Sequence, residues 1–272
     1  MEIHNEMDIL ELTKKYETEI RQNYNNGLNK SSIDKYQKGS IRTCEAYALY
    51  SLIRENNFQN ILDIGTGKGF SSLIFAKALQ KNNLAPAQID TIDINKNYEI
   101  ELFKKFELDF LITFHKGKSS QILPMLNKNY DMALIDGEHT YQQTKEDFIN
   151  IYPKVKVGGV IAFHDVYLRN IPKSGPCDVL KEIVEQGGRV IWFDEGIFNY
   201  FAFQEDTYDA ERILKKWEQH NYSYVRRDWS PKCLMALYIK TDENIVLTMD
   251  KVVVPDKIIQ PDEEYMKDWL ND

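Results

Sequence analysis

Short apolar runs alternate with segments of helical periodicity through the middle of the chain. Four runs rich in apolar residues lie at 61–64, 89–94, 132–135 and 160–163. Residues 73–79 and 142–152, which follow the first and third runs, have the spacing of helices. Apolar strands that alternate with helices predict a mostly parallel sheet with helices on both faces. Further runs at 111–115, 190–193 and 198–203 complete seven predicted strands, and residues 194–196 join the last two in a hairpin-like pair. A glycine pair at 158–159 is expected to turn into the fifth strand.

Polar residues close the four main runs. Carboxylates stand at Asp63, Asp93 and Asp136, and the pair His164 and Asp165 follows the run at 160–163. Ligands of open parallel sheets bind beyond the carboxyl ends of the strands. The pattern therefore predicts that these polar residues meet at one edge of the sheet.

Three alternating glycines follow the first run. Gly65, Gly67 and Gly69 form G-x-G-x-G, whereas a dinucleotide site uses G-x-G-x-x-G and this chain has Phe70 in place of its last glycine. A carboxylate at Asp63, two residues before the turn, would repel a pyrophosphate and attract an ammonium group. The open N–H groups of the following helix would face the same ligand.

Asp93 follows the glycine turn by about 20 residues, the spacing of an acid that binds a ribose diol. The alternative is an Asp that caps the segment 95–97. Both a methyltransferase and a dehydrogenase use a ribose-binding acid here, so Asp93 does not separate the two.

The motif at 60–72 resembles the first motif of the class I S-adenosylmethionine-dependent methyltransferases, in which an acid precedes G-x-G-x-G. The resemblance implies a Rossmann-like seven-stranded sheet and S-adenosyl-L-methionine as cofactor. The cofactor-binding positions that it implies are Asp63, Gly65, Thr66, Gly67, Gly69, Phe70, Ser71, Asp93, Ile94, Gly117, Lys118, Ser119 and Asp136.

Segments 135–141 and 158–166 carry a narrower resemblance, to O-methyltransferases of macrolide and aminocoumarin sugars and a cephalosporin-biosynthesis homologue, and more distantly to catechol-type enzymes. It implies methylation of a hydroxyl on a sugar or glycosylated small molecule, assisted by a divalent metal, usually magnesium. The implied metal ligands are Asp136, His164 and Asp165. The implied catalytic residues are Asp136 and a base at Glu138 or His139.

His164 departs from that pattern, because many relatives have an acid there. Imidazole suits zinc, iron, nickel or copper better than magnesium. Neighbouring strand residues also point to opposite faces, so His164 and Asp165 can share an ion only if the strand has already ended. His164 could instead be a buried hydrogen-bonding residue, and residues 138–141 could simply cap the next helix.

Two other functions remain open at this stage. An NAD-linked oxidoreductase fits the same fold, although the glycine spacing and Asp63 argue against it. A methyltransferase-like binding module without catalysis is the other, and His164 in the metal pair favours it.

We divide the chain into an N-terminal helical lid or arm at 1–40, a methyltransferase core at 41–205 and a C-terminal appendage at 206–272. Residues 7–20 place apolar side chains on one helical face, and Ser40 is expected to cap a helix that runs to about residue 57. A helix at 209–219 and apolar runs at 234–239 and 244–254 follow the core.

Net charge, apolar run length and cysteine content restrict the classes of partner that the chain is expected to bind. The net charge of −8 argues against nucleic acid. No apolar run approaches about 18 residues and the N-terminus lacks the pattern of a signal peptide, which argues against a membrane. Cys44, Cys177 and Cys233 are odd in number and lack C-x-x-C spacing, which favours a reducing, cytoplasmic setting. The expected partner is a small-molecule acceptor, with a homo-oligomer possible.

Overall fold

The computed structural model describes residues 8–28, 41–95, 99–166, 175–193, 195–201, 235–241 and 244–249. Its helices are α1 (Ile9–Lys15), α2 (Glu17–Asn25), α4 (Thr43–Asn56), α5 (Phe70–Asn82), α6 (Glu99–Lys105), α7 (Ser119–Ile122), α8 (Tyr141–Ile151), α9 (Pro176–Glu185) and α10 (Glu195–Tyr200). Its strands are β1 (Asn60–Ile64), β2 (Gln88–Asp93), β3 (Ile112–Lys116), β4 (Tyr130–Ile135), β5 (Val155–Phe163), β6 (Arg189–Trp192) and β7 (Ala236–Ile239).

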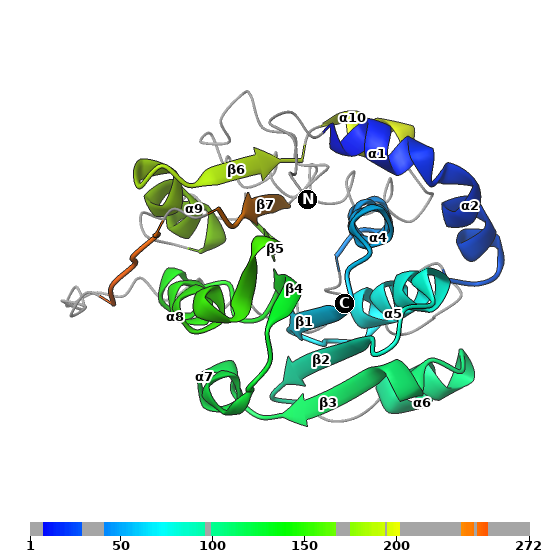
Figure 1. The fold of residues 1–272 in the computed structure, drawn as a ribbon, viewed down its shortest axis with the longest axis horizontal. Helices are drawn as coiled ribbons and strands as arrows, with labels where there is room; N and C mark the ends of the chain where they lie inside the picture. Colours follow the sequence, from blue (N-terminus) through cyan, green and yellow to red (C-terminus); the bar gives the residue numbers. More distant parts are fainter. Residues whose placement is uncertain are drawn as a thin grey trace, which may run out of the picture.

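Within the described residues, these seven strands form one sheet in the order β3-β2-β1-β4-β5-β7-β6 (Figure 1). Strands β3, β2, β1, β4 and β5 are parallel to one another, and β7 runs antiparallel to both β5 and β6. The predicted Rossmann-like, mostly parallel sheet of seven strands is confirmed.

Register brings the ends of the central strands to one level. Ile64 of β1 pairs with Ile92 of β2 and with Ile135 of β4, and Ile135 pairs with Phe163 of β5. The residues that follow these four positions therefore emerge side by side, as expected for ligand-binding positions of an open parallel sheet.

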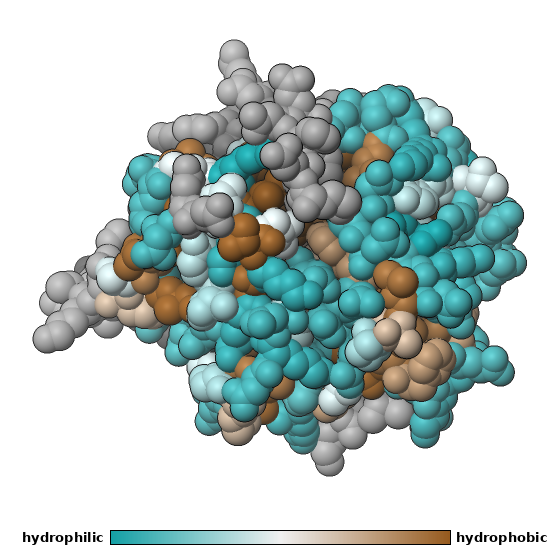
Figure 2. All heavy atoms as spheres, in the orientation of Figure 1, coloured by the Kyte–Doolittle hydropathy of each residue, from teal (hydrophilic) through white to brown (hydrophobic). Residues whose placement is uncertain are grey.

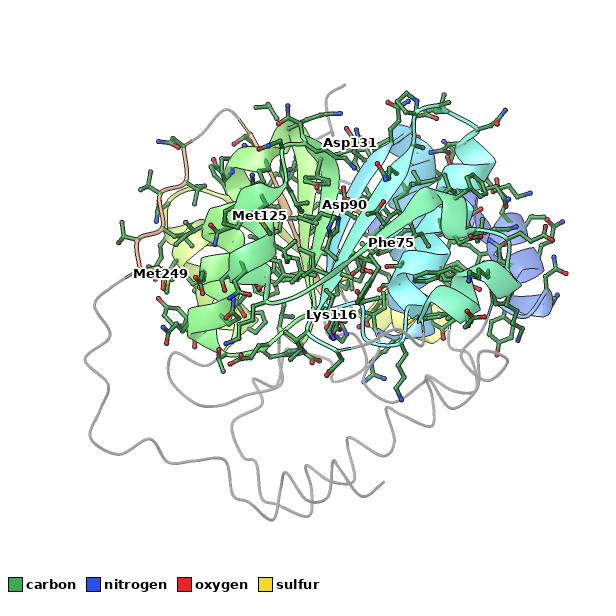
Figure 3. All side chains as sticks on the ribbon, turned by 90° about the horizontal axis from the view of Figure 1, so that it is seen from below. Phe75, Asp90, Lys116, Met125, Asp131 and Met249 are labelled. Carbon is green, nitrogen blue, oxygen red and sulfur yellow. The ribbon has the colours of Figure 1, made fainter. Side chains whose placement is uncertain are left out.

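Helices cover both faces of the sheet (Figure 1). Helices α1, α4, α5 and α10 enclose one apolar cluster with the sheet, and α8 and α9 enclose a second on the other face. Figure 3 shows Phe75 of α5 and Met125, beside α7, on opposite sides of the strands. In the same view Asp131, near the start of β4, and Lys116, at the end of β3, mark the two opposite edges.

The N-terminal segment packs against the outer side of α4. Tyr16 and Lys15 bond the carboxylate of Glu55, at 2.9 and 2.5 Å. Glu19 accepts hydrogen bonds from Tyr50 and Arg54 of α4. This contact is a packing role for residues 8–28, and a lid role remains a prediction. The segment forms two helices that meet at Tyr16, and the second continues to residue 25, beyond the helical face predicted at 7–20.

The N-cap of α4 is Arg42, not Ser40 as predicted. The carboxylate of Glu45 accepts a hydrogen bond from the Arg42 backbone N–H at 2.8 Å. A glutamate at the third helical position can satisfy this N–H group, so the helix starts two residues later than expected.

The prediction of a strand at 198–203 is wrong: the chain forms α10 at Glu195–Tyr200. Ile197 and Phe201 are both buried in the cluster beside α1 and α4, and their spacing of four residues is helical. The run is rich in aromatic residues, which are common in strands, but the spacing of the buried residues is that of a helix. The strand that pairs with β6 is instead β7.

The strand β7 lies in the part of the chain assigned to a C-terminal appendage, yet it joins the sheet between β5 and β6. We therefore place residues 236–239 with the sheet, and the three-part division of the chain stays a prediction. The expected helix at 209–219 lies outside the described residues.

The glycine pair at 158–159 lies within β5 and does not precede it, which corrects the predicted turn. A Cβ at Gly159 would meet the Asp131 and Lys156 carbonyl oxygens at 2.8 Å, and the register between β4 and β5 shifts at this point. Pairing with β7 continues across the shift, since Gly158 N donates to Lys240 O. The glycines thus permit a bulge inside a continuous strand.

No helix within the described ranges is long and apolar enough to cross a membrane. On the face seen in Figure 2, hydrophilic side chains cover most of the surface and hydrophobic ones form small separate groups.

Candidate active site at the carboxyl edge of the sheet

The glycine turn lies directly against the end of β4. Gly65 N and Thr66 N both donate to Ile92 O of β2, at 2.9 and 3.1 Å. Gly65 has φ +96°, and a Cβ there would lie 2.1 Å from the Asp136 carbonyl oxygen. Only glycine permits this close approach and this backbone conformation, so the turn and the fourth strand form one edge.

Asp63 is fully buried beneath this turn. Its Oδ2 accepts hydrogen bonds from the Ser71 and Ser72 hydroxyls at the start of α5, at 2.7 and 2.5 Å. Its Oδ1 is also buried and has no hydrogen-bond partner among the residues that the structure describes. Buried polar atoms are nearly always paired, so an unpaired acceptor beside a glycine turn fits a ligand that carries N–H donors.

Burial raises the pKa of Asp63 to about 7. The hydroxyls of Ser72 and Ser71 oppose this rise, and the carboxylates of Asp136 and Asp93 add to it. The group is therefore half-protonated near neutral pH, and a cationic partner would ionise it.

Asp93 connects two turns at the end of β2. Its Oδ2 accepts from Gly67 N and its Oδ1 from Asn95 N, both at 2.8 Å. The hydrogen bond from Asn95 N forms the local turn that is expected if Asp93 caps residues 95–97. Each carboxylate oxygen has two lone pairs, so both oxygens retain capacity for a diol.

The other predicted cofactor positions surround this edge in different ways. Gly117 N donates to Asp93 O at 2.9 Å, which places the turn after β3 beside Asp93. Ile94 is 62% exposed. The side chains of Thr66, Phe70 and Ser71 are buried, whereas Lys118 is exposed and Ser119 begins α7.

A cluster of carboxylates and imidazoles follows β4 and β5. Nδ1 of His139 lies 2.5 Å from Oδ2 of Asp165, and its Nε2 lies 3.6 Å from Oδ1 of Asp136. These three residues can each offer one ligand atom within 4.8 Å of the others. Two carboxylates and an imidazole form a donor set that fits a divalent cation.

His164 occupies a different position from the one implied for a ligand. Its Nδ1 lies 2.9 Å from Oδ1 of Asp136, and its Nε2 lies 3.1 Å from Oε2 of the buried Glu45. Both ring nitrogens thus face carboxylates, whereas the described side chains that lie close enough to share one ion are Asp136, His139 and Asp165. The role of His164 as a ligand remains a prediction that this geometry does not favour.

The sequence required that the strand end before His164 if His164 and Asp165 are to face the same side. This is the case, because β5 ends at Phe163 and Asp165 has φ +54°. His164 Nδ1 and Asp165 Oδ1 lie 3.5 Å apart. The turn thereby directs two consecutive side chains into the same space, which a continuing strand could not do.

Opposite charges shift the pKa values of the cluster. Burial opposes the charged form of His164, but Asp136, Asp165 and Glu45 outweigh it and raise its pKa well above the usual value. Burial likewise opposes the charge on His139, while Asp165 and Asp136 raise its pKa. Burial would raise the pKa of Asp165, but the two histidines hold it at about 2. The carboxylates therefore attract positive charge strongly, as a cation site does.

Glu138, the other predicted base, is exposed and accepts a hydrogen bond from Thr140 Oγ1 at 3.1 Å. Thr140 is the N-cap of α8 and accepts from Gln143 N at 3.3 Å. The helix-capping alternative therefore describes Thr140, and Glu138 is not among the residues that could share one ion.

Residues 62–166, which hold the glycine turn and this cluster, match a family described as "Methyltransferase domain". The fold is shared with the O-methyltransferase NovP, at a TM-score of 0.50 and 15% identity over 74% of this chain and 81% of that one. It is also shared with cofactor-bound Rv0187 from MTB, at a TM-score of 0.51 and 12% identity over 88% and 93%. Residues 62–166 are therefore similar in sequence to methyltransferase domains, and the sheet has the Rossmann-like order expected of a class I methyltransferase.

Curated relatives of the methyltransferase domain include a caffeoyl-CoA O-methyltransferase of Medicago sativa, 29% identical over 52% of this chain and 58% of that protein. Caffeoyl-CoA O-methyltransferase 2 of Petunia hybrida is 31% identical over 52% and 59%. The match thus spans less than two thirds of the length of these relatives.

Glu45, which precedes the matched residues, contacts the site but was not predicted from the sequence. It lies 18 residues before Asp63, in a helix whose other buried positions are mostly apolar. Its spacing of three residues from Arg42 is that of a capping glutamate, which was the available signal. Nothing in the sequence showed that the same carboxylate reaches His164.

Affinity for S-adenosylhomocysteine should rise about tenfold between pH 6 and pH 8 if its ammonium group binds Asp63. The pKa of about 7 lies above the ordinary 3.8, so the ligand-free protein holds a proton that is lost as pH rises through 7. The ammonium group prefers the ionised carboxylate. Calorimetry at both pH values measures this.

The Asp63→Asn variant should bind S-adenosylhomocysteine more weakly, and its affinity should no longer rise between pH 6 and pH 8. Methylthioadenosine, which lacks the amino-acid part, is the matched ligand, and its affinity for the wild type should change by no more than about twofold between the two pH values. Equal affinity for S-adenosylhomocysteine at pH 6 and pH 8 would contradict the placement of the ammonium group.

Proposed function

We propose that the chain is an S-adenosylmethionine-dependent O-methyltransferase that acts on a hydroxyl of a small molecule with the help of a divalent cation. The observation that carries the proposal is the position of the unpaired Asp63 Oδ1 on the same sheet edge as Asp136, His139 and Asp165. One group suits the cationic end of the cofactor, and the others suit the reacting oxygen.

Cofactor binding rests on two acids. Asp63 offers a buried acceptor for the ammonium group, and Asp93 offers two oxygens for the ribose diol. The turn that joins them, at Gly65 and Gly67, brings backbone and not side chains to the ligand. The similarity of residues 62–166 to methyltransferase domains supports this assignment.

Asp136, His139 and Asp165 would hold the cation. When bound, it would lower the pKa of the acceptor hydroxyl and fix its oxygen. His164 contacts Asp136 at 2.9 Å and is itself held by Glu45 at 3.1 Å, so the imidazole keeps the Asp136 carboxylate in one orientation. The resemblance implied magnesium, whereas the imidazole of His139 suits zinc or iron better.

The transfer moves a methyl group from the sulfonium sulfur to the acceptor oxygen. The electron pair of the broken C–S bond stays on sulfur, and the hydroxyl proton leaves to a base. His139 is oriented by Asp165 through Nδ1 and presents Nε2 to the cluster. This arrangement suits a metal ligand and also a base, and Glu138 is the second candidate base.

The acceptor that the sequence favours is a sugar or glycoside hydroxyl. The curated relatives are named for caffeoyl-CoA, so an aromatic diol is the second acceptor class. Both classes present a hydroxyl to the same cluster, and a direct assay separates them.

The test is release of S-adenosylhomocysteine from S-adenosylmethionine with two acceptor panels, sugar nucleotides and catechols including caffeoyl-CoA. Transfer should require a divalent cation, cease in EDTA and return with Mg²⁺, Mn²⁺ or Zn²⁺. Binding of NADH in place of S-adenosylhomocysteine would indicate an oxidoreductase. Cofactor binding without transfer to any acceptor would indicate a binding module.

A pair of variants separates the two roles of His139. His139→Gln should lower turnover by about 10- to 100-fold. A parallel fall in Mn²⁺ affinity, measured by electron paramagnetic resonance, identifies a ligand, whereas unchanged affinity identifies a base. Glu138→Gln should leave turnover within about threefold; a larger loss there would move the base to Glu138.

A further inference from the structure

Asp147 is a buried acid outside the cluster. It lies on α8 and is fully buried. Its Oδ1 accepts a hydrogen bond from Gln143 Nε2 at 3.1 Å. Its Oδ2 is buried and has no hydrogen-bond partner in the described part of the chain. An unpaired buried acceptor requires an explanation.

The unpaired oxygen lies between two loops of the ligand edge. It is 3.9 Å from the position that a Cβ would take on Gly137, directly after Asp136. Gln143 Nε2 also donates to Ser119 Oγ at 3.2 Å, so one side-chain amide joins Asp147 to the start of α7. Asp147 therefore closes the space between the turns that follow β3 and β4.

The space between these two turns lies next to Asp93, where the ribose is proposed to bind. Gly117 N donates to Asp93 O, and only Lys118 separates Gly117 from Ser119. Ile94, directly after Asp93, is 62% exposed and offers an apolar surface to an aromatic ring. A nucleoside whose diol binds Asp93 can rest its base on Ile94 with one edge toward Ser119 and Asp147.

The chemistry of Asp147 selects the base. Burial raises the pKa of Asp147 to about 6, while the nearby side chains of Ser119 and Gln143 oppose the rise. The group is therefore mostly an acceptor at neutral pH. Adenine carries an amino group at position 6, whereas hypoxanthine carries a carbonyl there, which a carboxylate would repel.

We propose that Asp147 Oδ2 accepts a hydrogen bond from the 6-amino group of the cofactor and so selects adenine over 6-oxopurines. The inference rests on the proposed function, since it requires that the nucleoside lie on Asp93. It adds a base-recognising residue on the helix after β4, supported by Gln143 and Ser119. A binding site strongly rejects a ligand that leaves a buried polar atom of the site without a hydrogen bond.

The experiment compares S-adenosylhomocysteine with S-inosylhomocysteine by calorimetry at pH 7.5. The wild type should bind the adenosyl compound at least about tenfold more tightly. In Asp147→Asn the preference should fall to within about threefold, because the amide can donate to the 6-carbonyl. The matched control is Glu146→Gln, the same kind of change on the neighbouring, partly exposed residue, which should keep the wild-type ratio.

Gln143→Ala is the second variant, in case Asp147→Asn does not fold. It removes the amide that holds Asp147 and should reduce the preference in part. Equal binding of both compounds by the wild type, or an unchanged ratio in Asp147→Asn, would overturn the inference while leaving the proposed function intact. Binding of neither compound by the wild type would overturn the proposed function as well.

Discussion

Gly65→Ala is expected to lower the affinity for S-adenosylhomocysteine more than about 100-fold and to reduce stability by about 3 kcal/mol or more. A Cβ at this position would lie 2.1 Å from the Asp136 carbonyl oxygen, and the backbone has φ +96°. The backbone fixes the position of the Cβ, and the atom that it meets is a backbone oxygen, so no side-chain rotation can relieve the clash. Calorimetry and thermal unfolding measure the two effects.

Gly67→Ala is the matched control. It also has positive φ, at +51°, but the nearest atom to its Cβ would be Gly65 O at 3.9 Å. We expect a stability loss of only about 1 kcal/mol, the cost of a left-handed conformation in a residue with a Cβ. If Gly65→Ala lost no more than this control, the close contact between the turn and β4 would be wrong.

Asp136→Asn is expected to lower turnover by about 10³-fold, because it removes a charge from the proposed cation site and from the contact to His164. Mn²⁺ affinity should fall in parallel, whereas affinity for S-adenosylhomocysteine should fall much less. Turnover with saturating metal and metal binding by electron paramagnetic resonance are the two measurements.

Asp131→Asn serves as the control, because it makes the same change near the other end of β4 (Figure 3). Asp131 accepts hydrogen bonds from Gln59 N and Asn60 N and pairs with Lys156. It should lose about 1 kcal/mol of stability and keep wild-type turnover. Normal turnover in Asp136→Asn would show that the proposed cluster takes no part in the reaction.

Local sequence was sufficient for most of the parallel sheet. The apolar runs that became β1, β2, β4 and β5 were each recognisable from composition and from the turn residues after them. Parallel strands also align their carboxyl ends, so the meeting of Gly65, Asp93 and Asp136 at one edge followed from strand order alone. Those arguments need only the chain's local periodicity.

The last strands were harder for a physical reason. The segment at 198–203 has strand-like composition, but Phe201 and the preceding Ile197 pack at helical spacing against α1 and α4. The strand partner of β6 lies more than 40 residues further along the chain, at Ala236–Ile239. Pairing over such a separation depends on the packed sheet and has no signature within either segment.

The residue types at the site were readable from the sequence, because an acid before alternating glycines and polar residues after strands have limited uses. Which atoms meet depended on packing. Asp165 turns at φ +54° and takes His139 as its partner, while His164 turns to Asp136 and to Glu45 from a distant helix. Asp147 likewise lies against Gly137 only because α8 folds back on the sheet. Contacts between side chains far apart in the chain are set by how helices pack on strands, and that information is not local.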